Sequence, residues 1–348
     1  MEPAPVSFRR SASAEPATLN SLSRAMLARA MAALDGGGVS KALELAGVNW
    51  PNDAAVPIIL RAAVTPTSMS STALVPVRQQ FVEALRAMAA GPELLARAGL
   101  ALSSFGQGTV SVPGFAPGES DFVGELAPIP VKQFVSSAAA LTPYKLATIV
   151  VVSGELIEHS DAEGILRSAL TESAALALDR VLFSNAAAVP GVKPAGLLNG
   201  IAALTPGTGG GGQDLMAADI AKLLTAIAPV AGAGFAIIAS AAQAVSLQLR
   251  LAQQVPNVMF SSALAAGTVI AVAPQAIAAV LETPRIDSSI EATLHMDSAP
   301  AAIANGGGVA APTRSLFQTN TVGLRMITPL SWALRSPSAV AWMSGVNW

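Results

Sequence analysis

The sequence predicts an α+β protein, because a strand-forming run is followed closely by one long amphipathic helix. The strand is expected at 147–152, where apolar and β-branched residues suit an element buried on at least one face. From Asp161 the apolar residues recur at helical spacing, and neither proline nor glycine follows Gly164 until the chain has passed Asn185. About two dozen residues at 1.5 Å each give a helix of roughly 35 Å, long for a globular protein.

The start and the buried face of this helix are also predicted by its residues. Ser160 and Glu163 form an S-x-x-E capping box, in which side chains accept hydrogen bonds from otherwise unpaired backbone amides. The expected buried face carries small and apolar residues, with larger ones beside it. The face comprises Ala162, Leu166, Ala169, Leu170, Ser173 and Ala177, flanked by Ile165, Leu176 and Phe183. By itself, such a helix also suits the core of an ordinary α+β domain.

The chain before this strand and helix predicts mainly helices, followed by one unusual excursion. Helices are expected at 18–34, 40–46, 76–88 and 92–98, with a linker at 64–72 and a strand at 109–112. The segment 113–131, PGFAPGESDFVGELAPIPV, combines proline, glycine and acids with isolated large apolar residues. Its composition favours a long extended excursion with a function, and it fits a disordered surface loop equally well.

After the long helix, the composition predicts a turn-rich crossover, a glycine linker and a second α/β region. The glycines at 207–212 lack the Lys-Ser/Thr of a phosphate-binding loop, so a flexible linker is the better interpretation. Helices and strands alternate from 213 to 284. The last part predicts strands at 290–296, 322–327 and 338–343, with a short helix at 314–319.

Composition excludes several classes of protein. A net charge of −2, with only 12% charged residues, leaves no electrostatic footprint for nucleic acid or for an anionic membrane surface. The chain is 52% hydrophobic but only 4% aromatic, which indicates close backbone packing or large protein–protein contacts. It has no cysteine, so disulfides and thiolate chemistry are excluded. The long apolar runs are interrupted by proline and polar residues, so we expect no membrane-spanning helix, and the N-terminus does not resemble a secretory signal.

The inventory of catalytic residues is small. His159 and His295 are the only histidines, and neither has a partner at metal-ligand spacing. The motifs of serine hydrolases, zinc proteases, dinucleotide-binding folds and phosphate-binding loops are absent. An acidic cluster could hold a divalent cation or serve as an acid/base pair, but acids at a helix start are stabilising in any case. It comprises Glu155, Glu158, Asp161 and Glu163. We therefore expect no catalytic, cofactor or metal site.

Three motifs around the long helix together resemble the major capsid proteins of tailed phages. They are Lys145–Ser160 (KLATIVVVSGELIEHS), Leu178–Phe183 (LDRVLF) and Pro194–Leu198 (PAGLL). In that family a similar strand and turn precede a long spine helix, and a proline–glycine turn follows it. Asn185 and its neighbours stand here in place of the glycine that usually ends the helix.

Weaker similarities extend the resemblance to residues 72–348. The closing stretch Ser315–Trp342 resembles the family's C-terminal pattern. Leu74–Pro76, with the helix after it, is similar to the start of the N-arm. Val123–Glu125, together with Ile129 and Pro130, is similar to part of the extended loop.

The resemblance implies the Hong Kong phage-type major capsid fold and assigns each part of the chain to it. The parts are an N-terminal helical segment, scaffold-like or vestigial, at 1–71; the N-arm and the start of the peripheral domain at 72–108; the extended loop at 109–143; the peripheral domain with the spine helix at 144–212; the axial domain at 213–284; and the return strands of both domains at 285–348. Loop residues expected to contact a neighbouring subunit are Phe115, Phe122, Glu125, Leu126, Ile129 and Pro130.

Some members of this family join their subunits through a lysine–asparagine isopeptide bond. By spacing from Pro130 and Pro337, Ile129 stands at the place of the lysine and Asn320 at that of the asparagine. Ile327 stands at the place of the assisting glutamate. Two of the three groups are missing, so we predict that Asn320 forms no covalent cross-link. Whether residues 1–71 are cleaved, retained or a vestigial scaffold stays open.

The implied function is that of a structural protein and not of an enzyme. Copies of the chain would assemble, through hexamers and pentamers, into an icosahedral phage or prophage-derived shell around double-stranded DNA. The implied partners are further copies, DNA packaged without sequence-specific binding, and a scaffold, maturation protease and portal, with no membrane and no cofactor. The implied location is the virion capsid, after assembly in the host cytoplasm. An encapsulin-like or gene-transfer-particle shell protein is an alternative; a maturation protease is another, although the chain lacks a Ser/His or Cys/His set.

Overall fold

The computed structural model of the chain contains two units, each assembled from three separate stretches of sequence. Unit 1 comprises Met1–Ala84, Ala147–Ala174 and Thr283–Thr328, and unit 2 comprises Leu85–Leu146, Ala175–Glu282 and Pro329–Trp348. The structure describes residues 21–62, 85, 89–102, 104–106, 108–114, 122–123, 139–159, 162–209, 212–232, 234–251, 258–297, 304–305, 308–309 and 312–348.

Three long elements contribute residues to both units, and two of them are the predicted strand and helix. They are β4 (Tyr144–Ser153), α7 (Ala162–Leu182) and β14 (Thr321–Leu334). Exposed and half-buried residues alternate along most of β4, as expected for a strand with one covered face. The helix α7 has 21 residues, close to the expected length. The predicted mixture of helix and sheet is confirmed.

The connection between β4 and α7 is helical, whereas the resemblance to the capsid family implies a turn there. It forms a short helix, α6 (Gly154–His159). The hydroxyl oxygen of Ser153 accepts a hydrogen bond from the backbone amide of Leu156 at 3.2 Å. This side chain therefore caps the first turn of α6, a role that serine commonly plays at helix starts.

The buried face of α7 is rotated relative to the predicted one. Ala162, Leu166, Leu170 and Phe183 are buried as expected, but Ala169, Ser173, Ile165 and Leu176 are exposed. The buried face instead continues through Ala174, Ala175, Leu178 and Leu182. Apolar residues occur on every side of this alanine-rich helix, so spacing alone does not select the face that packs.

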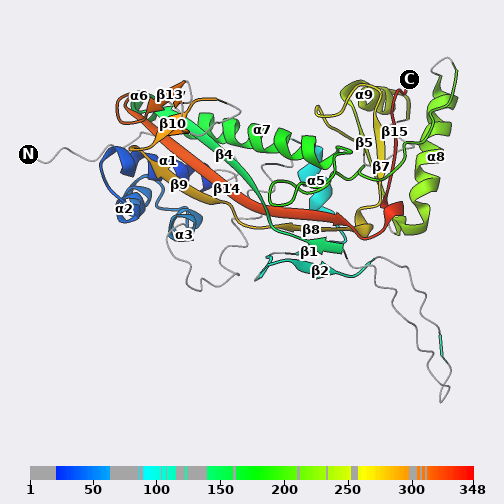
Figure 1. Cartoon of the computed structure of the whole chain (residues 1–348), viewed down its shortest axis with the longest axis horizontal. Helices are drawn as coiled ribbons and strands as arrows, with labels where there is room; N and C mark the ends of the chain where they lie inside the picture. The colour runs from blue at the N-terminus through cyan, green and yellow to red at the C-terminus, as the bar shows by residue number, and fades with distance from the viewer. Residues whose placement is uncertain are drawn as a thin grey trace, which may run out of the picture. The chain divides into compact units, whose positions relative to one another are not determined.

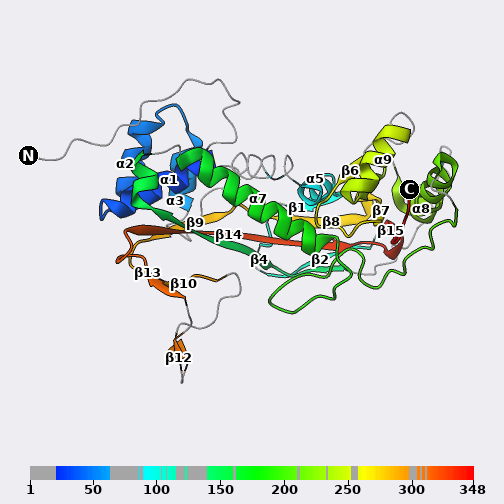
Figure 2. The ribbon, with the colours of Figure 1, turned by 90° about the horizontal axis from the view of Figure 1, so that it is seen from above.

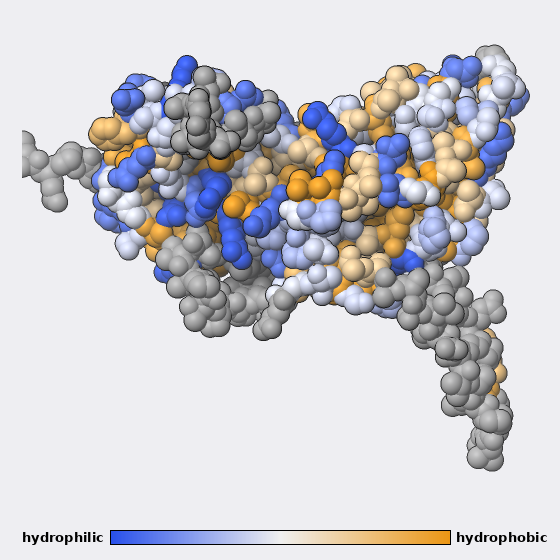
Figure 3. Space-filling view, viewed as in Figure 1, coloured by the Kyte–Doolittle hydropathy of each residue, from blue (hydrophilic) through white to orange (hydrophobic). Residues whose placement is uncertain are grey.

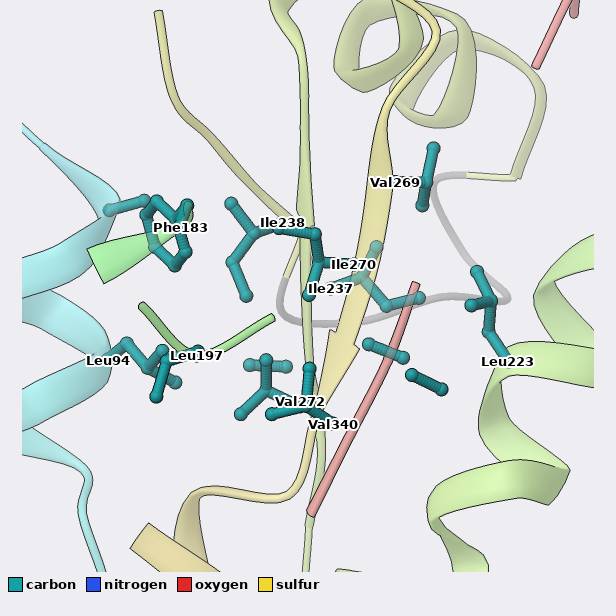
Figure 4. Packing of buried hydrophobic residues seen from close by; sticks show 14 of the residues in the cluster. Leu94, Phe183, Leu197, Leu223, Ile237, Ile238, Val269, Ile270, Val272 and Val340 are labelled. Atoms are coloured by element: carbon teal, nitrogen blue, oxygen red, sulfur yellow. The ribbon is translucent and has the colours of Figure 1, made fainter. Parts of the chain in front are cut away.

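Unit 2 is built around a four-stranded sheet whose two central strands are buried on both faces. The strand order is β15 (Val340–Met343), β7 (Val269–Val272), β5 (Ala236–Ala239), β6 (Val258–Phe260), and only the β5–β6 pair is parallel. Helix α8 (Gln213–Ala231) runs alongside β15 and β7 (Figure 1). Figure 4 shows Leu223 of α8 on one side of these strands, and Phe183 and Leu197 on the other. Side chains thus fill both sides, which explains why β5 and β7 contain no polar residue.

A second group of strands in unit 2 pairs with the end of β14. Strand β8 (Ile277–Leu281) pairs in parallel with β1 (Leu100–Leu102), and in antiparallel fashion with Leu330–Leu334. The short 3-10 helix η1 (Pro274–Ala276) precedes β8. Helix α5 (Ala90–Ala96) packs on the core of the four-stranded sheet through Ala90, Leu94 and Leu95.

Unit 1 combines N-terminal helices with several paired strands. Its elements include α1 (Ser21–Leu34), α2 (Val39–Asn49), α3 (Ala55–Ala62), β9 (Arg285–Ser289), β10 (Thr293–His295), β11 (Ala304–Asn305), β12 (Gly308–Val309) and β13 (Thr313–Ser315). The helices α1 and α3 pack against β9, and Figures 1 and 2 both show the three helices grouped there. Strand β9 pairs with residues 323–327 of β14, and β10 pairs with β13. The short helix expected at 314–319 is absent: Arg314 and Ser315 belong to β13, and a turn follows them.

Candidate assembly surfaces

The predicted loop excursion begins and ends at a fixed base in unit 2. Strand β2 (Val110–Val112) pairs with β3 (Ala139–Leu141), so Val112 faces Ala139. Val112 and Leu141 are buried against Phe105 in a small apolar cluster. Just beyond the base, Arg335 Nε donates a hydrogen bond to the Pro113 carbonyl oxygen at 3.1 Å. Both ends of the stretch 113–138 are therefore held by a packed strand pair.

One of the six predicted contact residues of the excursion is described by the structure. Phe122 is completely exposed, and its neighbour Val123 is also exposed. A fully exposed phenylalanine contributes little to the fold of its own chain, which suits a contact with another molecule. The other five residues lie outside the described part: Phe115, Glu125, Leu126, Ile129 and Pro130. Their role in contacts stays a prediction.

A second exposed apolar surface, which sequence reasoning missed, lies on α9 (Ala241–Leu251). The inward residues Ala244 and Leu247 are buried, whereas Val245 and Leu249 on the outer face are 54% and 81% exposed. Phe260, on the neighbouring edge strand β6, is 61% exposed. Figure 3 shows apolar residues reaching the surface among hydrophilic ones at the end that carries α9. We call Val245, Leu249 and Phe260 the α9 surface.

The exposed apolar face of α9 could have been predicted from the spacing of its residues in the sequence. Val245 and Leu249 are four residues apart, so they share one helix face, and Ala244 and Leu247 lie on another. A surface helix normally has polar residues on the face opposite its buried stripe. Two branched apolar residues there are the signal for a contact outside the chain.

The residues at the start of α9 bind the C-terminal stretch, although Ser240 and Gln243 have the S-x-x-Q spacing of a capping box. The Ser240 hydroxyl donates to the Gln243 side-chain oxygen, which also accepts from the Gly267 backbone amide at 3.0 Å. The Gln243 amide donates to the carbonyl oxygens of Val346 and Trp348 at 3.5 and 3.4 Å. The Ser240 backbone amide bonds to the Thr268 carbonyl instead of to Gln243. Gln243 therefore connects α9 to two other segments of unit 2.

Asp179, from the LDRVLF motif, is a buried carboxylate that holds the start of α5. Its Oδ1 accepts from the Gly91 backbone amide at 2.7 Å, and its Oδ2 accepts from the Ser261 hydroxyl at 2.5 Å. Burial raises the pKa of Asp179 above its ordinary value, while the hydrogen bonds from Ser261, Gly91 and Ala90 act in the opposite direction. The motif residue thus connects the end of α7 to α5 and to the strand end at Ser261.

The PAGLL motif reverses the chain against the end of α7. Leu197 and Leu198 are buried, and their amides bond to the carbonyls of Leu182 and Ser184 at 2.8 and 3.2 Å. A Cβ atom on Gly196 would lie 2.0 Å from the Ser184 carbonyl oxygen, so only glycine fits there. The glycine and the two leucines of the motif are therefore explained by packing in unit 2.

The remaining predicted site residues lie near the start of α7 and before β14. Ser160 lies outside the described residues, as does the side chain of Glu163, so the capping box stays a prediction. Asn320 is exposed in a turn with a positive φ of 48°. Its carbonyl oxygen accepts from the Gly154 amide at 2.9 Å, and its side chain lies so close that a Cβ on Gly154 would meet Nδ2 at 2.8 Å. Whether Asn320 is inert in cross-linking also stays a prediction.

The described residues offer no cluster that suits a metal ion or a membrane. No group of three histidine, aspartate or glutamate side chains among them could hold a metal. In the same part of the chain, no helix is both long enough and apolar enough to cross a bilayer. The exposed residues Phe122 and Val123 and the α9 surface can bury apolar area against another protein, so the described residues suit protein–protein contact.

Sequence comparison places the chain among phage proteins. The model of the phage capsid family matches residues 72–268, more than half of the 348 residues. A capsid polyprotein of Pseudomonas phage PAJU2 is 33% identical over 258 residues, which cover 66% of this chain. The chain spans 38% of the length of that relative.

Solved structures with a partial likeness come from phages as well. A structure from Mycobacterium phage Adephagia superposes with a TM-score of 0.49 at 16% identity, over 72% of this chain and 89% of that one. A structure from Mycobacterium phage Cain gives a TM-score of 0.49 at 17% identity, over 81% and 96% of the two chains. The assignment rests on the two sequence matches, and the family model covers the long helix α7 and most of unit 2. The chain belongs to the phage capsid family.

Proposed function

We propose that this chain is a major capsid protein that self-assembles into an icosahedral shell around double-stranded DNA. The observation that carries the proposal is the family match over 72–268, which includes both ends of the loop excursion and the α9 surface. The shell would be built from hexamers and pentamers of the chain, with the virion capsid as its location. Assembly in the host cytoplasm, aided by a scaffold, a maturation protease and a portal, belongs to the same proposal.

Two physical features of the chain support an assembly role. Large apolar side chains stay exposed at Phe122 and on the α9 surface, where contact with another copy would remove them from water. The net charge of −2 suits a shell that confines DNA without binding it through a basic surface. The named parts of the fold, from the N-arm to the axial domain at 213–284, are part of this proposal.

Electron microscopy of the purified chain, combined with analytical ultracentrifugation, tests the proposal. We expect capsomers or closed shells, and a chain that stays a monomer at high concentration would contradict it. Particles recovered from expressing cells are then treated with nuclease before their contents are extracted. Protected double-stranded DNA agrees with a phage shell, whereas an enclosed protein without DNA would favour the encapsulin-like alternative.

A further inference from the structure

The middle of α1 has no face open to solvent. Successive residues of an α-helix point about 100° apart, so four in a row point in all directions around the axis. Ala25, Met26 and Ala28 are 0% exposed, and Leu27 is 5% exposed. Ala30, Met31 and Ala32 in the next turn are buried too. A helix that is apolar and covered on all sides lies inside a fold.

Two groups of elements cover α1 from different directions. The helices α2 and α3 pack on it, and several apolar residues of these helices and of the turn between them are buried. These residues are Ala42, Leu45, Trp50, Val56, Ile59 and Leu60. The strand β9 and the helix α6 also contact α1. Ile286 of β9 and Ile157 of α6 are buried, and the Ser288 hydroxyl donates to the Arg29 carbonyl oxygen at 3.3 Å.

A nearly buried ion pair fixes how α1 and α3 pack together. Arg24 Nη1 lies 2.7 Å from Asp53 Oδ2, and the two side chains are only 11% and 9% exposed. The Ser21 hydroxyl donates to both Asp53 oxygens at 2.9 Å, and Asp53 Oδ1 accepts from the Ala55 amide at 3.2 Å. Asp53 thus receives hydrogen bonds from the starts of both helices. If Arg24 lost its charge, the Asp53 carboxylate would keep its hydrogen bonds but lose its counter-charge in a largely dry environment.

We propose that residues 21–62 form a resident three-helix subdomain that docks on the β9–α6 surface of its own chain through non-covalent contacts. It would keep that position in the assembled particle even where the linker at 64–72 is cut. Release of this segment would separate the buried middle turns of α1 from the strand and helix that cover them, at a cost in exposed apolar surface. Its departure would also expose apolar surface around Ile286 and Ile157 to water. The family match begins at residue 72, so this subdomain is an addition to the matched region.

A cut in the linker tests the docking directly. A recognition sequence for a specific protease is inserted between Pro66 and Thr67 of the full chain, and the purified protein is cut and passed through a size-exclusion column under native conditions. We expect the N-terminal fragment to elute with the remainder, as identified by denaturing gel and mass spectrometry. Elution of the fragment in its own later peak would overturn the proposal.

Two pairs of variants show whether the contacts described here hold the fragment. Met26→Asp places a charge in the enclosed turn of α1 and should release the fragment after cutting, whereas Val48→Asp on the exposed side of α2 should not. A milder pair serves if Met26→Asp prevents folding. Ile286→Ala shortens a buried side chain on β9, the strand that α1 contacts, and should speed dissociation of the fragment at least about tenfold, compared with no change for the exposed Arg285→Ala on the same strand. Equal behaviour within both pairs would refute the assigned contacts.

This inference stands apart from the proposed shell. The elution experiment needs no assembly, so a fragment that separates contradicts the docking alone. Where particles form, the subunit mass in washed particles should include residues 21–62, and their loss from every subunit would contradict retention. A chain that keeps its fragment but never assembles contradicts only the proposed function.

Discussion

The helices α1 and α9 have similar apolar contents and opposite surroundings. In α1, residues on every side are buried, and the elements that bury them belong to the same chain. In α9, the inner face is buried at Ala244 and Leu247, and the outer face presents Val245 and Leu249 to solvent. An apolar helix sequence therefore indicates that other residues cover the helix. The burial of each helix face then shows whether the covering residues belong to the same chain or must come from another molecule. For α1 the partner is present, and for α9 we expect another copy.

The means of attachment also differ between the two helices. α1 is held mainly by apolar enclosure, with the Arg24–Asp53 ion pair and hydrogen bonds near its start and end, whereas α9 belongs to a unit whose distant segments are connected by buried polar side chains. Asp219 of α8 is fully buried and accepts from the Gly207 amide at 2.8 Å and from Trp348 Nε1 at 3.0 Å. Together with Gln243 and Asp179, it ties segments that are distant in sequence. Unit 2 can thus expose the outer face of α9 while its inner face stays fixed.

The largest effect on stability is expected from shortening a side chain in the enclosed turn of α1. Met26→Ala should lower the free energy of unfolding of the three-helix subdomain by about 2–5 kcal/mol, because a fully buried side chain leaves a cavity. Val245→Ala on α9 is the matched change on an exposed face and should stay within about 0.5 kcal/mol. Hydrogen exchange of peptides from 21–34 and 241–251 measures the loss of local stability in Met26→Ala and in Val245→Ala. Similar costs at the two positions would remove the basis of the comparison.

A somewhat smaller effect is expected at Asp179, which tests the polar attachment. Asp179→Ala leaves the Gly91 amide and the Ser261 hydroxyl buried without their acceptor, at a cost of roughly 2–3 kcal/mol. Asp179→Asn should cost much less, since its oxygen can accept from Gly91 and its amide can donate to Ser261. Denaturant titration of the two variants gives the difference, and equal losses would show that hydrogen bonding is unimportant here.

The pH dependence of the free energy of unfolding, measured for the parent chain and for Asp179→Asn, gives the sign of the Asp179 contribution to stability. Burial raises the pKa of Asp179 in the folded state, so the folded chain binds the proton more tightly than the unfolded chain. The stability from this group is therefore present at low pH and is lost as the pH rises from the ordinary aspartate value through the raised pKa. The amide introduced by Asp179→Asn does not titrate, so the stability of this variant relative to the parent should increase over that range. A decrease would mean that the hydrogen bonds outweigh burial.

Much of the local structure could be predicted from the sequence, because it depends on neighbours in the chain. The β-branched run predicted β4, and the spacing of apolar residues predicted α7 to within a few residues. The helices expected at 18–34 and 40–46 correspond to α1 and α2. The helix α3 was missed, since Pro57 suggests a break, although proline is tolerated in the first turn of a helix.

What could not be predicted depends on contacts between distant residues. Asp179 looks like a solvent-facing acid in the sequence, and its two partners lie 88 residues before it and 82 residues after it. The rotation of α7, which exposes Ala169 and Ser173, follows from the elements it packs on and not from its own spacing. Gln243 fits a capping box by spacing, but besides Ser240 it bonds to the distant Gly267 amide and to the C-terminal stretch. Local patterns give elements, and tertiary contacts decide which faces are buried.

The smallest effect on folding, and the most informative for function, is expected on the α9 surface. Leu249→Gln and Phe260→Ser should change the free energy of unfolding by less than about 0.5 kcal/mol, because both side chains are mostly exposed. If another copy covers them, each loses about 1.5–3 kcal/mol of contact energy, and the concentration needed for assembly should rise at least about tenfold. Sedimentation measures that concentration, with Gln248→Ala on the same helix as the control. Unchanged assembly in both variants would place the subunit contact elsewhere and leave the exposed face of α9 without the partner that its apolar residues indicate.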